Sequence, residues 1–298
     1  MVVAKKYIVL NPFDGEPKKS DFAIVEEVLP ELQENDRHLF RVIESKNPEY
    51  PVGSWVMGHF GWRTHTVTKP ENEKFSAQKP YLYKLPDFGD LPVNTAYFGL
   101  TEICQPKAGE TVVISGAAGA VGSHVGQIAK ILGCRVIGIA GSDEKCEWLV
   151  KELGFDCAAN YKTTDIAEFL EENVPEGADC YFDNVGGELS STIMSKMNKF
   201  GRVAVCGAIS SYNETDPEKR KASILQFFFI GKGLKAEGFL VNRFADRNLE
   251  GINQNLKCVK EGKLKYKEHV TEGFESAVDA FIGLFRGDNI GKSIVKVK

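Results

Sequence analysis

The chain has 298 residues, of which 43% are hydrophobic and 26% charged, and its formal net charge is −4. This composition is typical of a globular enzyme and gives no reason to expect a nucleic acid or an acidic membrane as partner. No run reaches the roughly 18 apolar residues of a membrane span, and the N-terminus lacks a signal-peptide core. Seven dispersed cysteines, none spaced as Cys-x-x-Cys, predict reduced thiols and a cytoplasmic protein.

The two ends of the chain share the same pattern of predicted secondary structure. Residues 1–95 hold short strand-like pieces, among them 54–62 and 63–67, without regular helix alternation. Residues 259–298 hold strand-like pieces at 264–272 and 292–298 around a helix predicted over 274–286. We therefore expect both ends to build one lobe and residues 96–258 to build a second.

In the middle of the chain, β-branched runs alternate with helical patterns. This alternation of strands and helices predicts parallel strands joined by right-handed crossovers. The fold class is therefore α/β, with a doubly wound Rossmann sheet. The predicted strands are 111–115, 134–140, 156–160, 178–184, 202–206 and 234–240, and the predicted helices are 123–132, 143–153, 166–173 and 194–198.

A glycine-rich turn follows the first of these strands. It comprises Gly116, Ala117, Ala118, Gly119, Ala120, Val121 and Gly122. Glycines at this spacing let the backbone approach a pyrophosphate, and the helix that follows offers free N–H groups and a positive dipole end. A tight turn without a ligand is the alternative, but the surrounding β/α units favour a dinucleotide.

The tip of the second strand selects the nucleotide. An NAD site usually has an acid there, whereas this strand ends in Gly141 and Ser142. A neutral tip leaves room for a 2′-phosphate, with Ser142 or Lys162 as partner, so NADPH is favoured over NADH. Asp143 is the counter-evidence, but we expect it to cap the next helix.

A metal site is not predicted. The N-terminal region offers His38, His59 and His65 but no cysteine before Cys104, and we expect His59 and His65 to be packing or surface residues. Without a zinc ion to polarise an alcohol, hydride delivery to a polarised carbon–carbon double bond is the more natural reaction. No Gly-x-Ser-x-Gly nucleophile motif is present, so hydrolase chemistry is not supported.

Several motifs together resemble those of the prostaglandin reductases, also called leukotriene 12-hydroxydehydrogenases, a group of zinc-free medium-chain dehydrogenases/reductases. The likeness runs from Thr95 to the C-terminus, and more loosely over 20–29 and 42–66. The motifs are GAAGAVGS at 116–123, NYKT at 160–163, DCYFDNVGG at 179–187, CGAIS at 206–210 and GDNIGK at 287–292.

The resemblance implies a GroES-like β-barrel lobe beside the Rossmann lobe, and NADPH-dependent reduction of the double bond in α,β-unsaturated ketones and aldehydes. Such substrates include 15-oxo-prostaglandins and alkenals, which places the activity in lipid metabolism, and homodimers built through the last Rossmann strands are common in the group. It implies that the glycine turn binds the pyrophosphate, that Ser142 and Lys162 face the 2′-phosphate, and that Tyr181 flanks the adenine ribose. Asn184 is a further cofactor contact, and Asn289 reaches the cofactor from the other lobe. The residues along the nicotinamide are Cys206, Gly207, Ala208 and Ile209.

Some of these residues also have structural interpretations that need no cofactor. Tyr181 could pack in the core, Asn289 could serve its own turn, and Cys206 could be a small buried residue. No side chain is assigned to catalysis: a tyrosine, the nicotinamide ribose hydroxyl or a water can supply the proton.

The chain also departs from the group's pattern. Roughly thirty residues are missing between Asp21 and Val42 and about a dozen before Asn94, a loss that would expose strand edges. Asn242 stands where the group often has tyrosine. A quinone reductase and a catalytically weak NADPH-binding protein therefore remain as alternatives.

Overall fold

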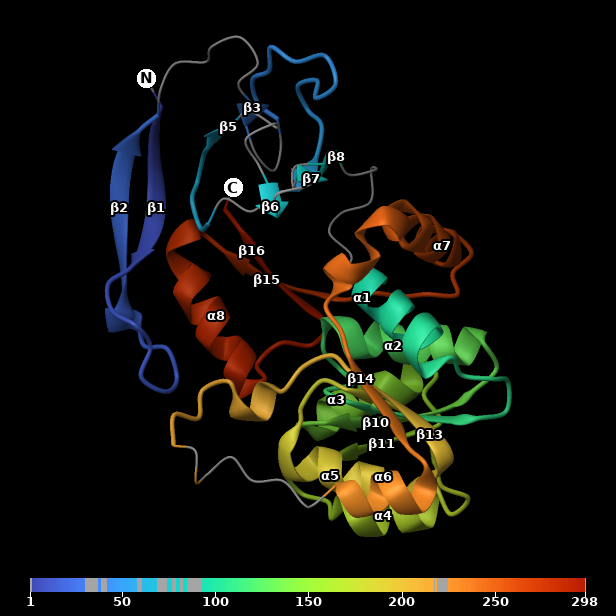
Figure 1. Ribbon diagram of the computed structural model, residues 1–298. Helices are drawn as coiled ribbons and strands as arrows, with labels where there is room; N and C mark the ends of the chain where they lie inside the picture. Colours follow the sequence, from blue (N-terminus) through green and yellow to red (C-terminus); the bar gives the residue numbers. More distant parts are fainter. Residues whose placement is uncertain are drawn as a thin grey trace.

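The computed structural model describes residues 2–29, 37–38, 42–57, 61–68, 74–76, 79–80, 83–84, 93–216, 218 and 225–297. Two lobes are visible in Figure 1. One is built around a parallel sheet from the middle of the chain, and the other contains segments from both ends.

The parallel sheet has six strands in the order β11-β10-β9-β12-β13-β14. The chain starts at β9, moves outward to β11, then returns to β12 and moves outward on the other side. The order therefore reverses between β9 and β12, where a doubly wound sheet binds its ligand. The predicted Rossmann sheet is confirmed. Its strands are β9 (Thr111–Ser115), β10 (Arg135–Ala140), β11 (Cys157–Asn160), β12 (Ala178–Asp183), β13 (Met197–Val205) and β14 (Lys235–Gly238).

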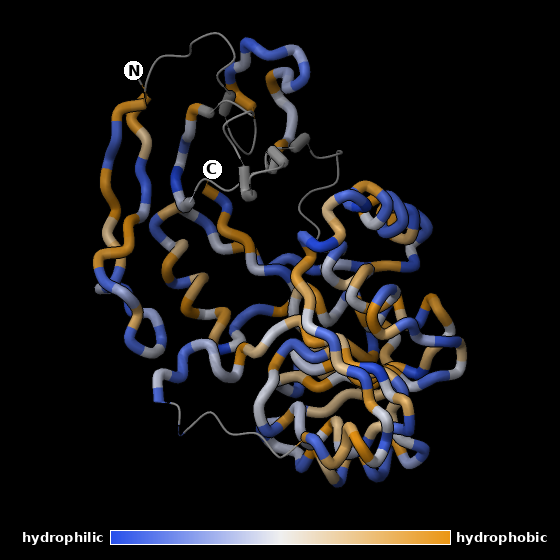
Figure 2. The backbone as a smooth tube through the Cα atoms, in the orientation of Figure 1, coloured by the Kyte–Doolittle hydropathy of each residue, from blue (hydrophilic) through white to orange (hydrophobic). Residues whose placement is uncertain are grey.

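Hydrophobic residues are buried on both faces of this sheet. In β9, Val112 and Ile114 belong to one buried cluster and Val113 belongs to the other. Burial on both faces explains why these strands read as continuous apolar runs, visible as orange segments of the tube in Figure 2. Around the sheet lie α2 (Ala120–Ile131), α3 (Asp143–Lys151), α4 (Ile166–Asn173), α5 (Gly187–Ser195) and α6 (Gln226–Lys232).

Two sequence-based predictions in this lobe are wrong. The helix predicted over 194–198 is α5, which ends at Ser195, and Met197 already belongs to β13. Asp143 does not cap α3: the Ser142 hydroxyl oxygen accepts from the Lys145 amide, and Asp143 accepts from Asn160 Nδ2 instead. The sequence pattern also missed α1 (Val93–Phe98), the helical segment Gly99–Cys104 and α7 (Asn248–Lys260).

The second lobe joins the two chain ends through aromatic packing. The hairpin of β1 (Val3–Val9) and β2 (Phe22–Val28) lies beside α8 (Ala277–Arg286) in Figure 1. The Phe22 ring lies 6.3 Å from that of Phe281, and the Tyr7 ring lies 5.0 Å from that of Phe274. The parallel pair β15 (Glu268–Glu272) and β16 (Lys292–Lys296) completes the C-terminal part.

The remaining strands of this lobe pair only two by two. Where the structure describes it, the lobe therefore has no closed barrel. The junctions at which the resemblance leads us to expect missing segments fall largely on 30–36, 39–41 and 85–92, outside the described residues. The pairs join β3 (Arg37–His38) with β5 (Val67–Thr68), β4 (Val56–Met57) with β8 (Tyr83–Lys84), and β6 (Lys74–Ser76) with β7 (Lys79–Pro80).

The described helices are all too short or too polar to cross a bilayer.

Candidate cofactor site

The glycine turn connects β9 directly to α2. Gly116 has φ +59°, a conformation that favours glycine, and Gly119 is the N-cap of α2. A Cβ atom at Gly122 would lie 2.5 Å from the Gly116 carbonyl oxygen, so only glycine lets the helix pack this closely on the turn. No side chain caps the first turn of α2, which leaves its N–H groups directed outward.

The C-terminal lobe touches this turn. The Gly291 amide donates a 2.8 Å hydrogen bond to the Ala118 carbonyl, and Gly119 pairs with Gly291 as an isolated parallel bridge. Asn289 lies in the same loop, where its Nδ2 donates to the Gly291 carbonyl at 2.8 Å. The loop therefore brings Asn289 near the glycine turn, while its side chain serves the turn in which it lies.

A buried carboxylate organises the loop that follows β12. Asp183 Oδ1 accepts from the amides of Val185 and Gly186, both at 2.9 Å, and Oδ2 accepts from the Ser190 hydroxyl at 2.6 Å. Asn184, next in sequence, donates from Nδ2 to the Ser115 carbonyl at 2.8 Å. Asn184 thus lies beside the glycine turn, at the switch point between β9 and β12.

Tyr181 belongs to this buried network. Its side chain has no exposed surface, and its hydroxyl lies 2.8 Å from Asp183 Oδ1 and 2.9 Å from Ser115 Oγ. Burial, and after it the Asp183 charge, raises the pKa of Tyr181 well above its ordinary value. The structure replaces the expected ribose contact with core packing, because Tyr181 points into the face of the sheet covered by the second buried cluster.

At the tip of β10 the structure gathers more polar groups than the sequence suggested. A Cβ on Gly141 would lie 3.1 Å from the Tyr161 ring and 3.6 Å from Lys162 Cε. Lys145, in the first turn of α3, extends its ammonium to the Gly287 carbonyl of the other lobe. Burial, and after it the Lys162 charge, lowers the pKa of Lys145. Lys145 and Tyr161 were missed, although the position of Lys145 three residues after Ser142 was a usable signal.

The segment after β13 lies beside the end of β12. The amides of Cys206 and Gly207 donate to the Asp183 carbonyl at 2.8 and 3.1 Å, and that of Ile209 donates to the Asn184 carbonyl at 3.4 Å. Burial, and after it Asp183, raises the pKa of the Cys206 thiol to about 11, so this thiol is protonated at neutral pH.

Tyr212 is a further residue that the sequence reasoning missed. Its hydroxyl accepts a 3.1 Å hydrogen bond from the Ala208 amide, and its side chain is mostly exposed. It directly follows the short helical turn Ile209–Ser211, so it lies on the surface of the segment expected along the nicotinamide.

Of the three histidines considered for a metal, the structure describes the side chain of His65 alone. His65 contacts Thr64 Oγ1 at 3.1 Å, His38 is placed only by its backbone in β3, and His59 lies outside the described residues. Throughout the described ranges, no three His, Cys, Asp or Glu side chains converge as metal ligands would.

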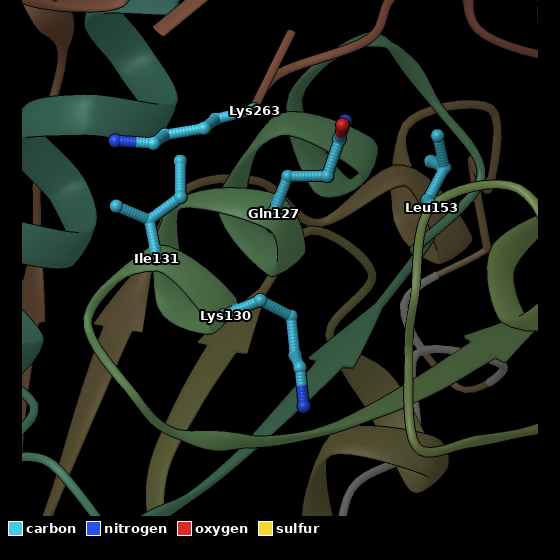
Figure 3. A pocket seen from close by; sticks show the side chains of 5 residues that line it. All are labelled: Gln127, Lys130, Ile131, Leu153 and Lys263. Atoms are coloured by element: carbon cyan, nitrogen blue, oxygen red, sulfur yellow. The ribbon is translucent and has the colours of Figure 1, made fainter. Parts of the chain in front are cut away.

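A hollow of about 330 Å³ lies at the other end of α2 from the glycine turn (Figure 3). Its polar groups are already engaged: Lys130 pairs with Asp156, and Gln127 binds the backbone of Lys265. It is therefore separate from the candidate cofactor site. The lining residues are Gln127, Lys130, Ile131, Leu153 and Lys263.

The residues present fit a dinucleotide phosphate. The glycine turn offers backbone N–H groups with no side chain at Gly116, Gly119 and Gly122, and the helix dipole favours an anion there. The positive charges of Lys145 and Lys162 form a second anion-binding site at the tip of β10. Two anion-binding sites at the ends of the neighbouring strands β9 and β10 match a pyrophosphate and a 2′-phosphate.

Comparison with known proteins agrees with this geometry. A family model described as "Zinc-binding dehydrogenase" matches residues 120–256. The chain is 45% identical to prostaglandin reductase 1 of Bos taurus over 331 aligned positions, which cover 99% of this chain and 100% of that protein. Because this chain has 298 residues, the bovine protein contains segments that it lacks.

Two further comparisons extend the likeness. The chain is 38% identical to the NADP(+)-dependent 2-alkenal reductase of Nicotiana tabacum, covering 100% of this chain and 87% of that one. The solved structure of CurA from Vibrio vulnificus in complex with NADPH superposes with a TM-score of 0.87 at 31% identity, covering 99% of both chains. The chain therefore belongs to the prostaglandin reductase family of medium-chain dehydrogenases/reductases.

Proposed function

We propose that the protein is an NADPH-dependent, zinc-independent reductase of the carbon–carbon double bond in α,β-unsaturated ketones and aldehydes. The observation that carries the NADPH part of this function is the pairing of the glycine-rich turn with two lysines at the next strand tip. Relatives named prostaglandin reductase 1 and 2-alkenal reductase support the same reaction class.

In this site NADPH supplies a hydride, which must reach the β-carbon of the enone at a separation of about 3–3.5 Å. The uncapped amides at the start of α2 would hold the pyrophosphate, and Lys145 and Lys162, with Ser142, would face the 2′-phosphate. The segment from Cys206 to Ile209 would border the nicotinamide. Asn184 braces the turn through Ser115, and the Asn289 loop closes over it from the other lobe.

The α-carbon of the substrate then needs a proton, and the developing oxyanion needs a donor. Tyr212 suits the role of the oxyanion donor, because its hydroxyl accepts from the Ala208 amide and its own proton is left to donate to the substrate oxygen. Donation there stabilises the enolate without requiring a metal ion.

The test follows NADPH absorbance with 4-hydroxynonenal, a 15-oxo-prostaglandin and a quinone as separate substrates. Turnover of the enal and enone with NADPH, and much slower turnover with NADH, is the expected result. Preference for the quinone would instead favour a quinone reductase. Solved structures of such enzymes, at 16–20% identity, show only that they share the fold of this chain. Tight NADPH binding without turnover on any substrate would show a weak binder instead.

We also propose a cytoplasmic homodimer that acts in lipid metabolism on eicosanoids or lipid-peroxidation products. The described cysteines are all free, as expected in a reducing compartment. Within the described part of the chain, the edge strand β14 pairs only with β13, and all four of its residues are exposed. An antiparallel copy centred on Ala236 would place Lys235 opposite Glu237 of the partner subunit, twice across the axis.

A further inference from the structure

The two lobes meet near both ends of the candidate site, and different segments make the two contacts. At the pyrophosphate end, the loop after α8 binds the glycine turn through the Gly291 amide and receives the Lys145 ammonium at the Gly287 carbonyl. At the Tyr212 end, the loop between β1 and β2 approaches Asn213. Gly15 there has φ +77°, and a Cβ on it would lie 3.7 Å from the Asn213 carbonyl oxygen.

One ion pair joins the two contacting segments. Arg286, the last residue of α8, donates from Nε to Glu16 Oε1 at 2.9 Å. Arg286 immediately precedes Gly287, and Glu16 immediately follows Gly15. The pair therefore connects the loop that touches the glycine turn with the hairpin loop that touches the segment after Tyr212.

Resting on the proposed function, we infer that the Glu16–Arg286 pair is a positioning contact for cofactor and substrate. It holds the hairpin loop against the Tyr212 segment while the same helix end holds the Gly287–Gly291 loop against the cofactor cradle. Both residues are substantially exposed, 43% for Glu16 and 63% for Arg286, so the pair adds little to folding stability. Its effect is expected in ligand binding, where the lobes must keep their relative position.

The chain offers a matched control. Lys19 and Asp279 also form an exposed ion pair between the same hairpin and the same helix, at 2.7 Å. Asp279 lies in the first turn of α8, away from the Gly287–Gly291 loop, so this pair joins the hairpin to the helix without linking the two lobe contacts.

The experiment compares Glu16→Gln, Lys19→Gln and the double charge reversal Glu16→Arg with Arg286→Glu. NADPH affinity is measured by fluorescence titration, with KM for an enal and the melting temperature measured in parallel. Glu16→Gln should weaken NADPH binding about two- to fivefold and raise KM for the enal, with an unchanged melting temperature. Lys19→Gln should match wild type, and the double reversal should recover the affinity.

Equal NADPH binding by wild type and Glu16→Gln would overturn the inference, as would equal losses in Glu16→Gln and Lys19→Gln. Failure of the double reversal to recover binding would also count against it. If the wild type itself does not bind NADPH, the proposed function fails first, and the two failures are thus distinguished.

Discussion

Lys145 and Lys162 present two like charges at the carboxyl end of β10, one from the first turn of α3 and the other from the loop after β11. Burial is the first cause that lowers the pKa of Lys145, and the neighbouring Lys162 is the second. Two neighbouring cations repel each other, and an anion such as a 2′-phosphate would relieve this repulsion.

We predict that Lys145→Ala and Lys162→Ala each weaken NADPH roughly 10- to 100-fold, because each removes a charge-assisted hydrogen bond to the phosphate. NADH has no 2′-phosphate and should be affected much less. Fluorescence titration with both cofactors measures the ratio. Equal losses for NADPH and NADH would contradict the assignment of the phosphate to these lysines.

We predict that the preference for NADPH over NADH declines with rising pH. Because burial and the neighbouring Lys162 lower the pKa of Lys145, this side chain loses its charge at a lower pH than an ordinary lysine does. The bound phosphate opposes this loss, so the decline should be clearest in the association of free enzyme with NADPH. Titrations at several alkaline pH values measure it, and Lys145→Arg, which cannot deprotonate, should remove the dependence.

We predict that two glycine substitutions in the turn differ in kind. Gly119→Val should abolish binding of both cofactors, because the side chain would block the backbone's approach to the pyrophosphate. The protein should still fold, since a Cβ there would lie 3.3 Å from the Gly116 carbonyl oxygen, a tight contact that a small shift of the turn relieves. Gly122→Ala should cost about 1–3 kcal/mol of stability, because its Cβ would overlap the backbone of Gly116 and Ala117. Circular dichroism and thermal melts separate the two effects. A folded Gly119→Val that retains cofactor would show that the turn does not hold the pyrophosphate.

We predict that Tyr212→Phe lowers kcat for enals about 100-fold, with NADPH affinity little changed, because the hydroxyl that donates to the developing oxyanion is lost. Steady-state kinetics and a cofactor titration on the same preparation give both values. A loss of less than about threefold would show that another group donates to the oxyanion. Tyr161→Phe, at the adenine end, is the matched control and should retain kcat.

We predict that Ile230→Asp and Leu240→Asp each convert the proposed homodimer to a monomer. Ile230 is 84% exposed and Leu240 is 71% exposed, and they flank the two ends of the free edge strand β14. Sedimentation at several concentrations measures the change. Val150→Asp on α3 is the control, and a wild-type protein that sediments as a monomer at micromolar concentration would refute the dimer.

Much of the Rossmann lobe was predictable because its signals are local. Thr111–Ser115 and Ile166–Asn173 were predicted with their observed bounds, since β-branched runs and apolar spacing report directly on strands and helices. The helix predicted over 194–198 failed because Met197 and its neighbours pair with β12, a long-range contact that outweighs local propensity. The lobe boundaries at 95 and 258, and the cofactor residues, stay predictions.

The sequence by itself determined the parallel sheet, the glycine turn and the absence of an acid at the second strand tip, because each depends on residues adjacent in the chain. Only the tertiary structure decided that Tyr181 is buried against Asp183, that Lys145 joins Lys162, and that Glu16 reaches Arg286. These relationships depend on how strands and helices meet across the fold, where burial and charge decide which side chains remain available to a ligand.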